Sequence, residues 1–152
     1  MIEFTGSFEH AIDDKGRLSV PSQFREVLAA SQDESLVVTR FRVEQHPCLH
    51  VYPGSEWRKL LRRLDEQLGR FGEQASRFRR AYVSVGARVT MDSQGRILIP
   101  PTLRELAKLD RDVVTTGGSN FFSVWDHAIW SDRMARDEPI FDDFEFLNSL
   151  RV

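Results

Sequence analysis

The segment DDKGRLSVPSQFRE, residues 13–26, occurs a second time as DSQGRILIPPTLRE, residues 92–105. The two segments align without a gap, 79 residues apart, and six of their fourteen positions are identical. Both contain a Gly-Arg turn followed by a short apolar run and a proline. A repeated turn presents the same basic side chain at two places on one molecule. Such an arrangement suits a repeated linear partner better than a single small substrate.

The repeat continues beyond this segment. LVVT at 36–39 corresponds to DVVT at 112–115, and LHVY at 49–52 corresponds to FSVW at 122–125. The offset between copies falls from 79 to 73 residues, so we expect a longer loop near residues 40–47 of the first copy. Each copy is predicted to run strand, Gly-Arg turn, strand, short helix, two strands, helix.

Local patterns support this order of elements. Apolar alternation in residues 8–12 and 17–20, around a glycine-containing turn, predicts a local β-hairpin. Pro21 and Pro100 end their strands and suit the first turn of a helix. The stretch 115–120 contains two glycines and indicates a plain turn between two strands. It lacks the Gly-Lys-Ser/Thr ending of a phosphate-binding loop.

We expect one unit over residues 1–152, made of a first half at 7–54, a helical insert at 55–82, a second half at 83–126 and a C-terminal helix with an acidic tail at 127–152. The insert has apolar residues at helical spacing on one face and many arginines on the other. Three interpretations of that basic face stay open: a solvated surface, a subunit contact, or a contact to a DNA backbone. The last helix is expected to begin near Asp126, a good N-cap residue.

Charge is distributed unevenly along the chain. The net charge is −2, and residues 137–152 hold five acids and one base, which leaves 20 bases and 18 acids in residues 1–136. Any anion-binding surface must therefore be local. The tail also carries several phenylalanines among its acids, so we expect it to pack against its own domain or a neighbouring subunit.

Several classes of protein are disfavoured by the sequence. The single cysteine excludes an intrachain disulfide and fits a reducing compartment. We find no signal-peptide pattern and no apolar stretch of membrane-spanning length, so a cytoplasmic location is expected. No nucleophile elbow, metalloprotease motif or paired-carboxylate signature indicates catalysis. We therefore expect no enzyme, no cofactor and no small-molecule substrate.

The segment HPCLH, residues 46–50, is the one metal-ligand candidate. Alternate residues of a strand share a face, so His46, Cys48 and His50 could converge. Pro47 is expected to break that strand, however, and there is no second cysteine. We predict no metal site.

The candidate binding residues lie in the two turns: Lys15 and Arg17 in the first, Gln94 and Arg96 in the second. A two-stranded ribbon fits the DNA major groove, and an arginine there can pair with guanine O6 and N7. Lys15 could hold a phosphate. The alternative is that each arginine forms an ion pair with Asp13 or Asp92 and only stiffens its turn.

These motifs, in this order and spacing, resemble the MraZ family of bacterial transcriptional regulators. The resemblance rests on Phe4-x-Gly6, DDKGRLSVP at 13–21, CLxVYP at 48–53, Trp57, DxxGRIxIP at 92–100 and Trp125. It implies an α+β fold with a mainly β core and flanking helices. Within that class it implies a swapped-hairpin, AbrB-like barrel formed by two internal repeats in one chain.

The resemblance also implies a function. MraZ proteins assemble into rings and bind tandem G-rich direct repeats in the promoter of the division and cell-wall gene cluster that contains their own gene, which they usually repress. Carried over by position, Lys15 and Arg17 would contact double-stranded DNA, with Gln94 and Arg96 in the second copy. A nucleoid-associated homo-oligomer is thus expected. The alternative is an interaction or antitoxin-like module that uses the basic turns and the Phe-rich tail.

Overall fold

The two copies of the repeat exchange strands with each other. The computed structural model describes residues 1–33, 35–69 and 71–152. Its strands are β1 (Ser7–Ala11), β2 (Arg17–Ser19), β3 (Leu36–Val43), β4 (His46–Pro53), β5 (Ala87–Val89), β6 (Arg96–Leu98), β7 (Asp112–Gly117) and β8 (Phe122–Asp126). Its helices are α1 (Ser22–Ser31), α2 (Gly54–Leu68), α3 (Glu73–Phe78) with a π-helical turn (Arg79–Val83), α4 (Pro101–Leu106), α5 (His127–Asp137) with a 3-10 turn (Glu138–Asp142), and α6 (Phe144–Leu150). This confirms the α+β class and the predicted order of elements.

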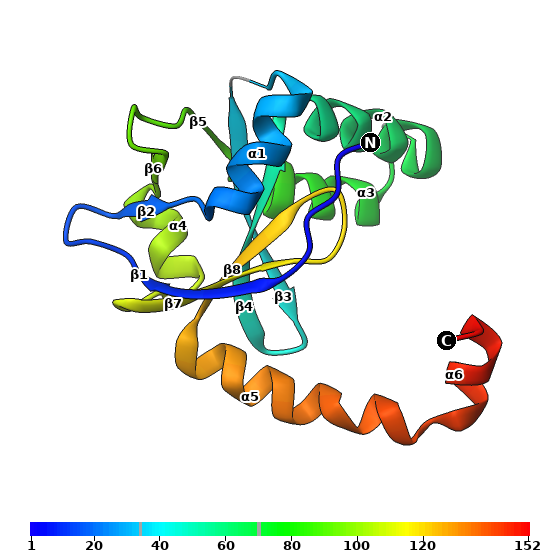
Figure 1. Ribbon diagram of the computed structural model, residues 1–152. Coiled ribbons are helices and arrows are strands. Elements are labelled where there is room, and N and C mark those ends of the chain that lie inside the picture. Colours follow the sequence, from blue (N-terminus) through cyan, green and yellow to red (C-terminus); the bar gives the residue numbers. More distant parts are fainter. Residues whose placement is uncertain (34, 70) are drawn as a thin grey trace.

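The sheet order is symmetric between the copies. Six antiparallel strands lie in the order β1-β7-β8-β4-β3-β5, and β2 pairs with β6 in a separate ribbon (Figure 1). Exchanging each strand for its counterpart in the other copy reproduces the same order. At the two central pairings, counterparts face each other: Leu18 opposes Ile97, and His50 opposes Ser123. The chain therefore has a pseudo-twofold axis through both sheets.

The predicted local hairpins are wrong. β1 pairs with β7 and β2 with β6, so the strands on either side of the Gly-Arg turn belong to different sheets. Only the turn itself is closed locally, by the Asp13 amide donating to the Arg17 carbonyl (3.1 Å) and the Gly16 amide donating to Asp13 (2.9 Å). The exchange agrees with the swapped arrangement expected from the family resemblance. Closure of the strands into a barrel stays a prediction.

The extra residues of the first copy do not form a longer loop. They lengthen β3 and β4 into a long hairpin with a turn at Glu44 and Gln45, where Glu44 has a φ of 54°. Pro47 does not break β4, contrary to expectation. It lies where β4 pairs only with β3, because pairing with β8 begins at Leu49, and proline is tolerated on such an edge.

The main core lies along the pseudo-twofold axis. Leu18 and Ile97 are almost fully buried, and Phe4, Phe24 and Phe122 meet edge-on or tilted with ring centroids 5.0–5.2 Å apart. Both copies contribute to this core. It holds the β2–β6 ribbon against the six-stranded sheet.

A second buried cluster joins α2 and α3 to the sheet. It contains Val37, Tyr52, Trp57 and Tyr82. The Tyr82 hydroxyl hydrogen-bonds to Tyr52 (2.7 Å) and to Nδ1 of His50 (2.8 Å). These bonds satisfy polar groups that burial would otherwise leave without partners.

Helix α5 begins as predicted. Asp126 is its N-cap and accepts hydrogen bonds from the amides of Ala128 and Ile129. Beyond α5 the chain continues into α6, which stands apart from the body (Figure 1). Among the helices in the described parts of the chain, none combines the length and apolarity needed to cross a membrane.

Candidate nucleic-acid interface

The two Gly-Arg turns have the same geometry. Asp13 accepts hydrogen bonds from the Lys15 amide (3.0 Å), the Arg17 amide (2.8 Å) and Arg17 Nε (2.7 Å). Asp92 accepts the equivalent bonds from the Gln94 amide, the Arg96 amide and Arg96 Nε, each at 2.9 Å. One carboxylate thus closes each turn and orients the arginine that directly follows the turn.

These bonds also set the protonation of the aspartates. The amide of the following arginine is the main cause that lowers the pKa of both carboxyls, and its guanidinium lowers it further. Both aspartates therefore stay charged at neutral pH and keep their arginines in place.

The ion-pair alternative and the DNA alternative are compatible. Both ion pairs are present, but each uses only the Nε edge of its guanidinium. Within residues 1–33, 35–69 and 71–152, no hydrogen-bond partner contacts the Nη atoms of Arg17 or Arg96. A guanine pairs with the two Nη nitrogens of an arginine. The aspartate can therefore orient the guanidinium through Nε and leave both Nη atoms available.

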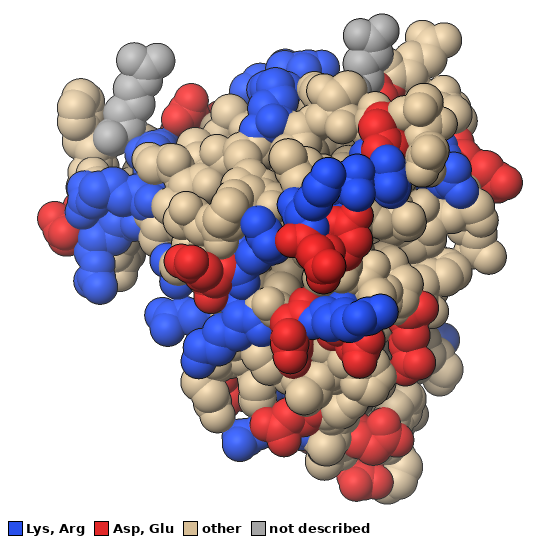
Figure 2. Space-filling view, turned by 90° about the vertical axis from the view of Figure 1, so that its left-hand side faces the viewer, with Lys and Arg blue, Asp and Glu red and all other residues tan. Residues whose placement is uncertain are grey.

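The β2–β6 ribbon brings the two arginines together. Arg17 opposes Leu98, and Arg96 opposes Ser19, while Leu18 and Ile97 point into the core. Because side chains alternate along a strand, Arg17 and Arg96 share the outward face as diagonal neighbours, typically about 7–8 Å apart. Figure 2 looks onto this end of the molecule, where Lys and Arg side chains gather with acidic side chains beside them.

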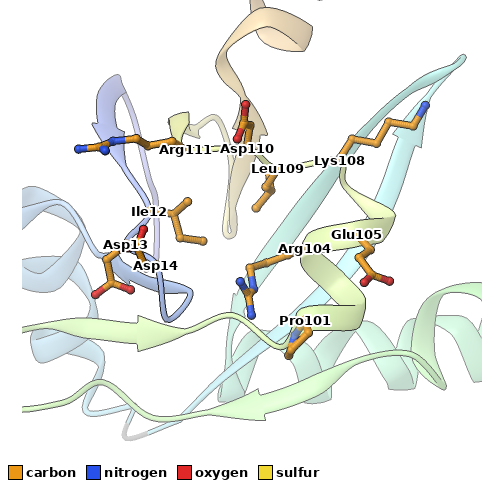
Figure 3. Close-up of a pocket in the computed structure, with 10 residues that line it drawn as sticks. All are labelled: Ile12, Asp13, Asp14, Pro101, Arg104, Glu105, Lys108, Leu109, Asp110 and Arg111. Atoms are coloured by element: carbon orange, nitrogen blue, oxygen red, sulfur yellow. The ribbon is translucent and has the colours of Figure 1, made fainter.

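Two further arginines support the turns, and the sequence analysis did not single them out. Arg104 of α4 packs on Gly16, so close that a Cβ there would lie 2.8 Å from its Cζ. Arg25 of α1 packs on Gly95 in the same way, with a distance of 2.6 Å to its Cδ. Figure 3 shows Arg104 pointing from α4 toward the Asp13–Asp14 loop. The signal was available, because Arg25 and Arg104 are among the six identical positions of the repeat.

Each copy therefore buttresses the turn of the other. Glycine is required at both positions for two reasons. The arginine side chains fill the space that a Cβ would occupy. The glycine backbone is also left-handed, with φ of 85° at Gly16 and 76° at Gly95. The two turns are held as one rigid unit across the pseudo-twofold axis.

The turns differ in their second basic position. Lys15 and Gln94 are both exposed, and within the described parts of the chain neither side chain has a hydrogen-bond partner. Only the first copy places a cation there. Arg96 is also less exposed than Arg17, with 27% against 36% of its side chain accessible. The first turn thus carries more accessible positive charge.

The three candidate metal ligands of the HPCLH segment lie in other environments. His46 Nε2 pairs with Asp132 (2.9 Å), His50 bonds to Tyr82, and Cys48 is buried. Among the described residues no group of three or more His, Cys, Asp or Glu could hold a metal ion.

The groove beside the first turn, between Asp13 and Arg104, is open and lined by charged side chains (Figure 3).

Fold and site together define an internally duplicated α+β protein that displays two oriented arginine forks on one ribbon. The sequence matches a family described as "MraZ protein, putative antitoxin-like" over residues 4–81 and 86–147. The chain belongs to the MraZ family.

Several relatives match over most of their length. A protein named transcriptional regulator MraZ from Polaromonas sp. is 34% identical, covering 94% of this chain and 99% of the relative. Proteins of the same name from Lactiplantibacillus plantarum (38% identical, covering 92% of this chain and 94% of the relative) and Acidithiobacillus ferrooxidans (40%, covering 84% and 85%) are also similar. Transcriptional regulation is a non-enzymatic role.

Proposed function

We propose that this protein is a sequence-specific DNA-binding transcriptional regulator that reads tandem G-rich repeats with Arg17 and Arg96. The names of its relatives support transcriptional regulation. The observation that carries the DNA contact is the pair of guanidinium groups, each oriented by an aspartate through Nε and without a hydrogen-bond partner at Nη among the residues that the structure describes. Lys15 would hold a phosphate in the first copy, and Gln94 would offer hydrogen bonds in the second.

The regulator acts as a ring of subunits on promoter direct repeats and represses its own promoter and the division and cell-wall genes beside it. One subunit binds weakly, since the net charge is −2. Several linked subunits on successive repeats raise the effective concentration and hence the affinity. The working location is the nucleoid.

Substitution of Arg17 tests the DNA contact. Arg17→Ala removes one guanine pair per subunit, which costs about 1–3 kcal/mol of binding free energy for each engaged subunit. We expect loss of specific binding to DNA from upstream of the gene, measured by gel shift, with an unchanged circular dichroism spectrum. Arg42→Ala is the matched control, because Arg42 is an exposed arginine on β3, away from the ribbon.

Arg96→Ala should weaken binding less, because its turn has Gln94 in place of lysine. Wild-type affinity in a folded Arg17→Ala variant would contradict the DNA-reading role. A larger loss for Arg96→Ala than for Arg17→Ala would reverse the ranking of the two turns.

A second candidate function is an interaction or antitoxin-like module. The observation that favours it is the exposed Phe-rich acidic tail, together with the antitoxin-like description of the family. A small dimer in light scattering that ignores the upstream DNA would support this candidate over the regulator.

A further inference from the structure

The C-terminal tail, residues 138–152, exposes large apolar side chains that its own body does not cover. Ile140, Phe141, Phe144, Phe146 and Leu150 are between 44% and 71% accessible. Helix α6 has no buried residue. A cluster of this kind on a formed element marks an interaction surface.

The direction of the tail is fixed by the body. Arg133 of α5 is buried and donates to Glu44 (3.1 Å), to the Val43 carbonyl (3.4 Å) and to Asp137 (2.8 Å). His46 pairs with Asp132 on the same helix (2.9 Å). These bonds clamp α5 onto the β3–β4 hairpin, so the tail leaves its end away from the sheet (Figure 1).

The tail is also structured where it stands. Asp143 caps α6 by accepting from the Phe146 amide (3.1 Å). An isolated helix of seven residues is not stable in water without packing. The apolar side of α6 therefore calls for a partner surface.

The complementary surface lies on α2 and α3. Arg58, Arg62, Arg63 and Arg77 are exposed there, and within the described ranges none of them forms an ion pair. Leu68, the last residue of α2, and Phe71, between α2 and α3, are also exposed. Three acids on these elements are paired: Glu56 with Lys59, Asp65 with Arg79 and Glu73 with Arg80. The surface around the other arginines, called the basic face here, therefore combines cations with apolar groups. The tail combines phenylalanines with Glu138, Asp142, Asp143 and Glu145.

We propose that the tail of one copy docks on the basic face of α2 and α3 of a second copy. The charges are opposite, and arginine guanidinium groups stack favourably on phenylalanine rings. The two surfaces are different, so the contact is heterologous and can repeat from subunit to subunit until a ring closes. This inference rests on the proposed function, because it names the contact that would build its ring.

Cross-linking between two variants tests the pairing directly. Copies with Phe144→Cys are mixed with copies with Leu68→Cys and treated with a short bifunctional thiol reagent. Cys48 is buried and burial raises the pKa of its thiol to about 12, so it does not compete. We expect a covalent dimer in the mixture and none with either variant alone.

The combined variant Phe144→Cys/Leu68→Cys separates docking between copies from folding back within one chain. Docking between copies gives a ladder of covalent oligomers. A cross-linked band that migrates only as a monomer would overturn the proposal, as would no cross-link in the mixture.

Charge reversal supplies a second test by light scattering. Arg62→Glu/Arg63→Glu should convert the large oligomer to monomers or small species, and adding Asp142→Arg/Glu145→Arg should restore it. Arg40→Glu/Arg42→Glu is the charge-matched control and should leave the oligomer intact. An oligomer unaffected by Arg62→Glu/Arg63→Glu would overturn the proposed interface.

Truncation after Asp137 distinguishes this inference from the proposed function. It keeps the partner of Arg133, so α5 stays clamped. We expect loss of the oligomer and a loss of affinity for multi-repeat DNA by a factor of about 10² or more, with single-repeat binding retained. An intact oligomer after truncation would overturn the tail contact alone. Loss of the Arg17 dependence of binding would overturn the function alone.

Discussion

A single carboxylate in each turn closes the loop and orients its arginine. Asp13 closes its turn through two amides and orients Arg17 through Nε. Because this bond uses Nε, the ion pair does not occupy the Nη atoms that the proposed base contact needs. The same holds for Asp92 and Arg96, so the duplicated residue pattern preserves a duplicated geometry.

His50 links stability to pH. Burial lowers the pKa of His50 to about 4, whereas in the unfolded chain its pKa is near the ordinary histidine value of 6.5. The unfolded state therefore gains a proton first as pH falls, and stability that is complete above pH 6.5 is lost progressively toward pH 4. Between pH 7.5 and pH 5 we expect a decrease of about 2 kcal/mol in the free energy of unfolding, measured by urea denaturation.

The control for this prediction is His50→Asn, which keeps a polar group near Tyr82 but does not titrate. Its unfolding free energy should change less between the two pH values. Burial also lowers the pKa of His10, so a smaller dependence remains in the variant. Equal slopes for the variant and the parent would rule out His50 as the source.

At the scale of elements, local sequence patterns predicted which segments form strands and helices but not which strands pair. The exchange of strands was expected only from the family resemblance. Alternation of apolar residues defines a strand and the face it buries, but it carries no information about the partner strand. The local hairpin was therefore the default expectation, and the exchange of β1 and β2 between sheets overturned it. Whether Pro47 interrupts β4 likewise depends on which strands pair with β4 at that position.

The candidate site was more predictable than the pairing. Arg17 and Arg96 stand out because the turn motif is repeated, and the structure brings them onto one ribbon face. Arg25 and Arg104 were missed because their role depends on a contact to the turn of the other copy, which local sequence does not contain. Identity at both positions of the repeat was the only available signal.

The turns should be intolerant of a Cβ. Gly16→Ala and Gly95→Ala each force a left-handed backbone on alanine and push against an arginine side chain. We expect each to lower the free energy of unfolding by about 1–3 kcal/mol, measured by chemical denaturation.

Gly118→Ala is the matched control, since a Cβ there meets no atom of the described residues within 4 Å. Its unfolding free energy should stay within about 0.5 kcal/mol of the parent. If Gly16→Ala were as stable as Gly118→Ala, the buttress of Arg104 on the turn would be without energetic consequence.

At the scale of the whole molecule, the proposed function requires a near-neutral subunit to gain affinity for DNA by binding as several linked copies. We expect DNA with two or more correctly spaced G-rich repeats to bind about 10²–10⁴ times more tightly than DNA with one repeat. Binding should also fall steeply with salt, because Lys15 and its equivalents release counterions from phosphates. Fluorescence anisotropy with one, two and four repeats measures both effects.

The control DNA carries the same repeats at altered spacing. It matches the total charge and the number of sites, so its affinity should drop toward that of a single repeat. Equal affinity for both spacings would show that the subunits bind independently.

The exchange of strands between copies also governs how the chain can be made. Ala11 pairs with Asp112 and Ser7 with Thr116, so β1 has no partner strand until β7 has left the ribosome. Such long-range pairings close slowly, because loop entropy is lost before the contacts form. During synthesis the strand edges of the N-terminal half therefore stay unpaired until the second half emerges. They can then pair with the second half of the same chain, or with that of another chain translated beside it.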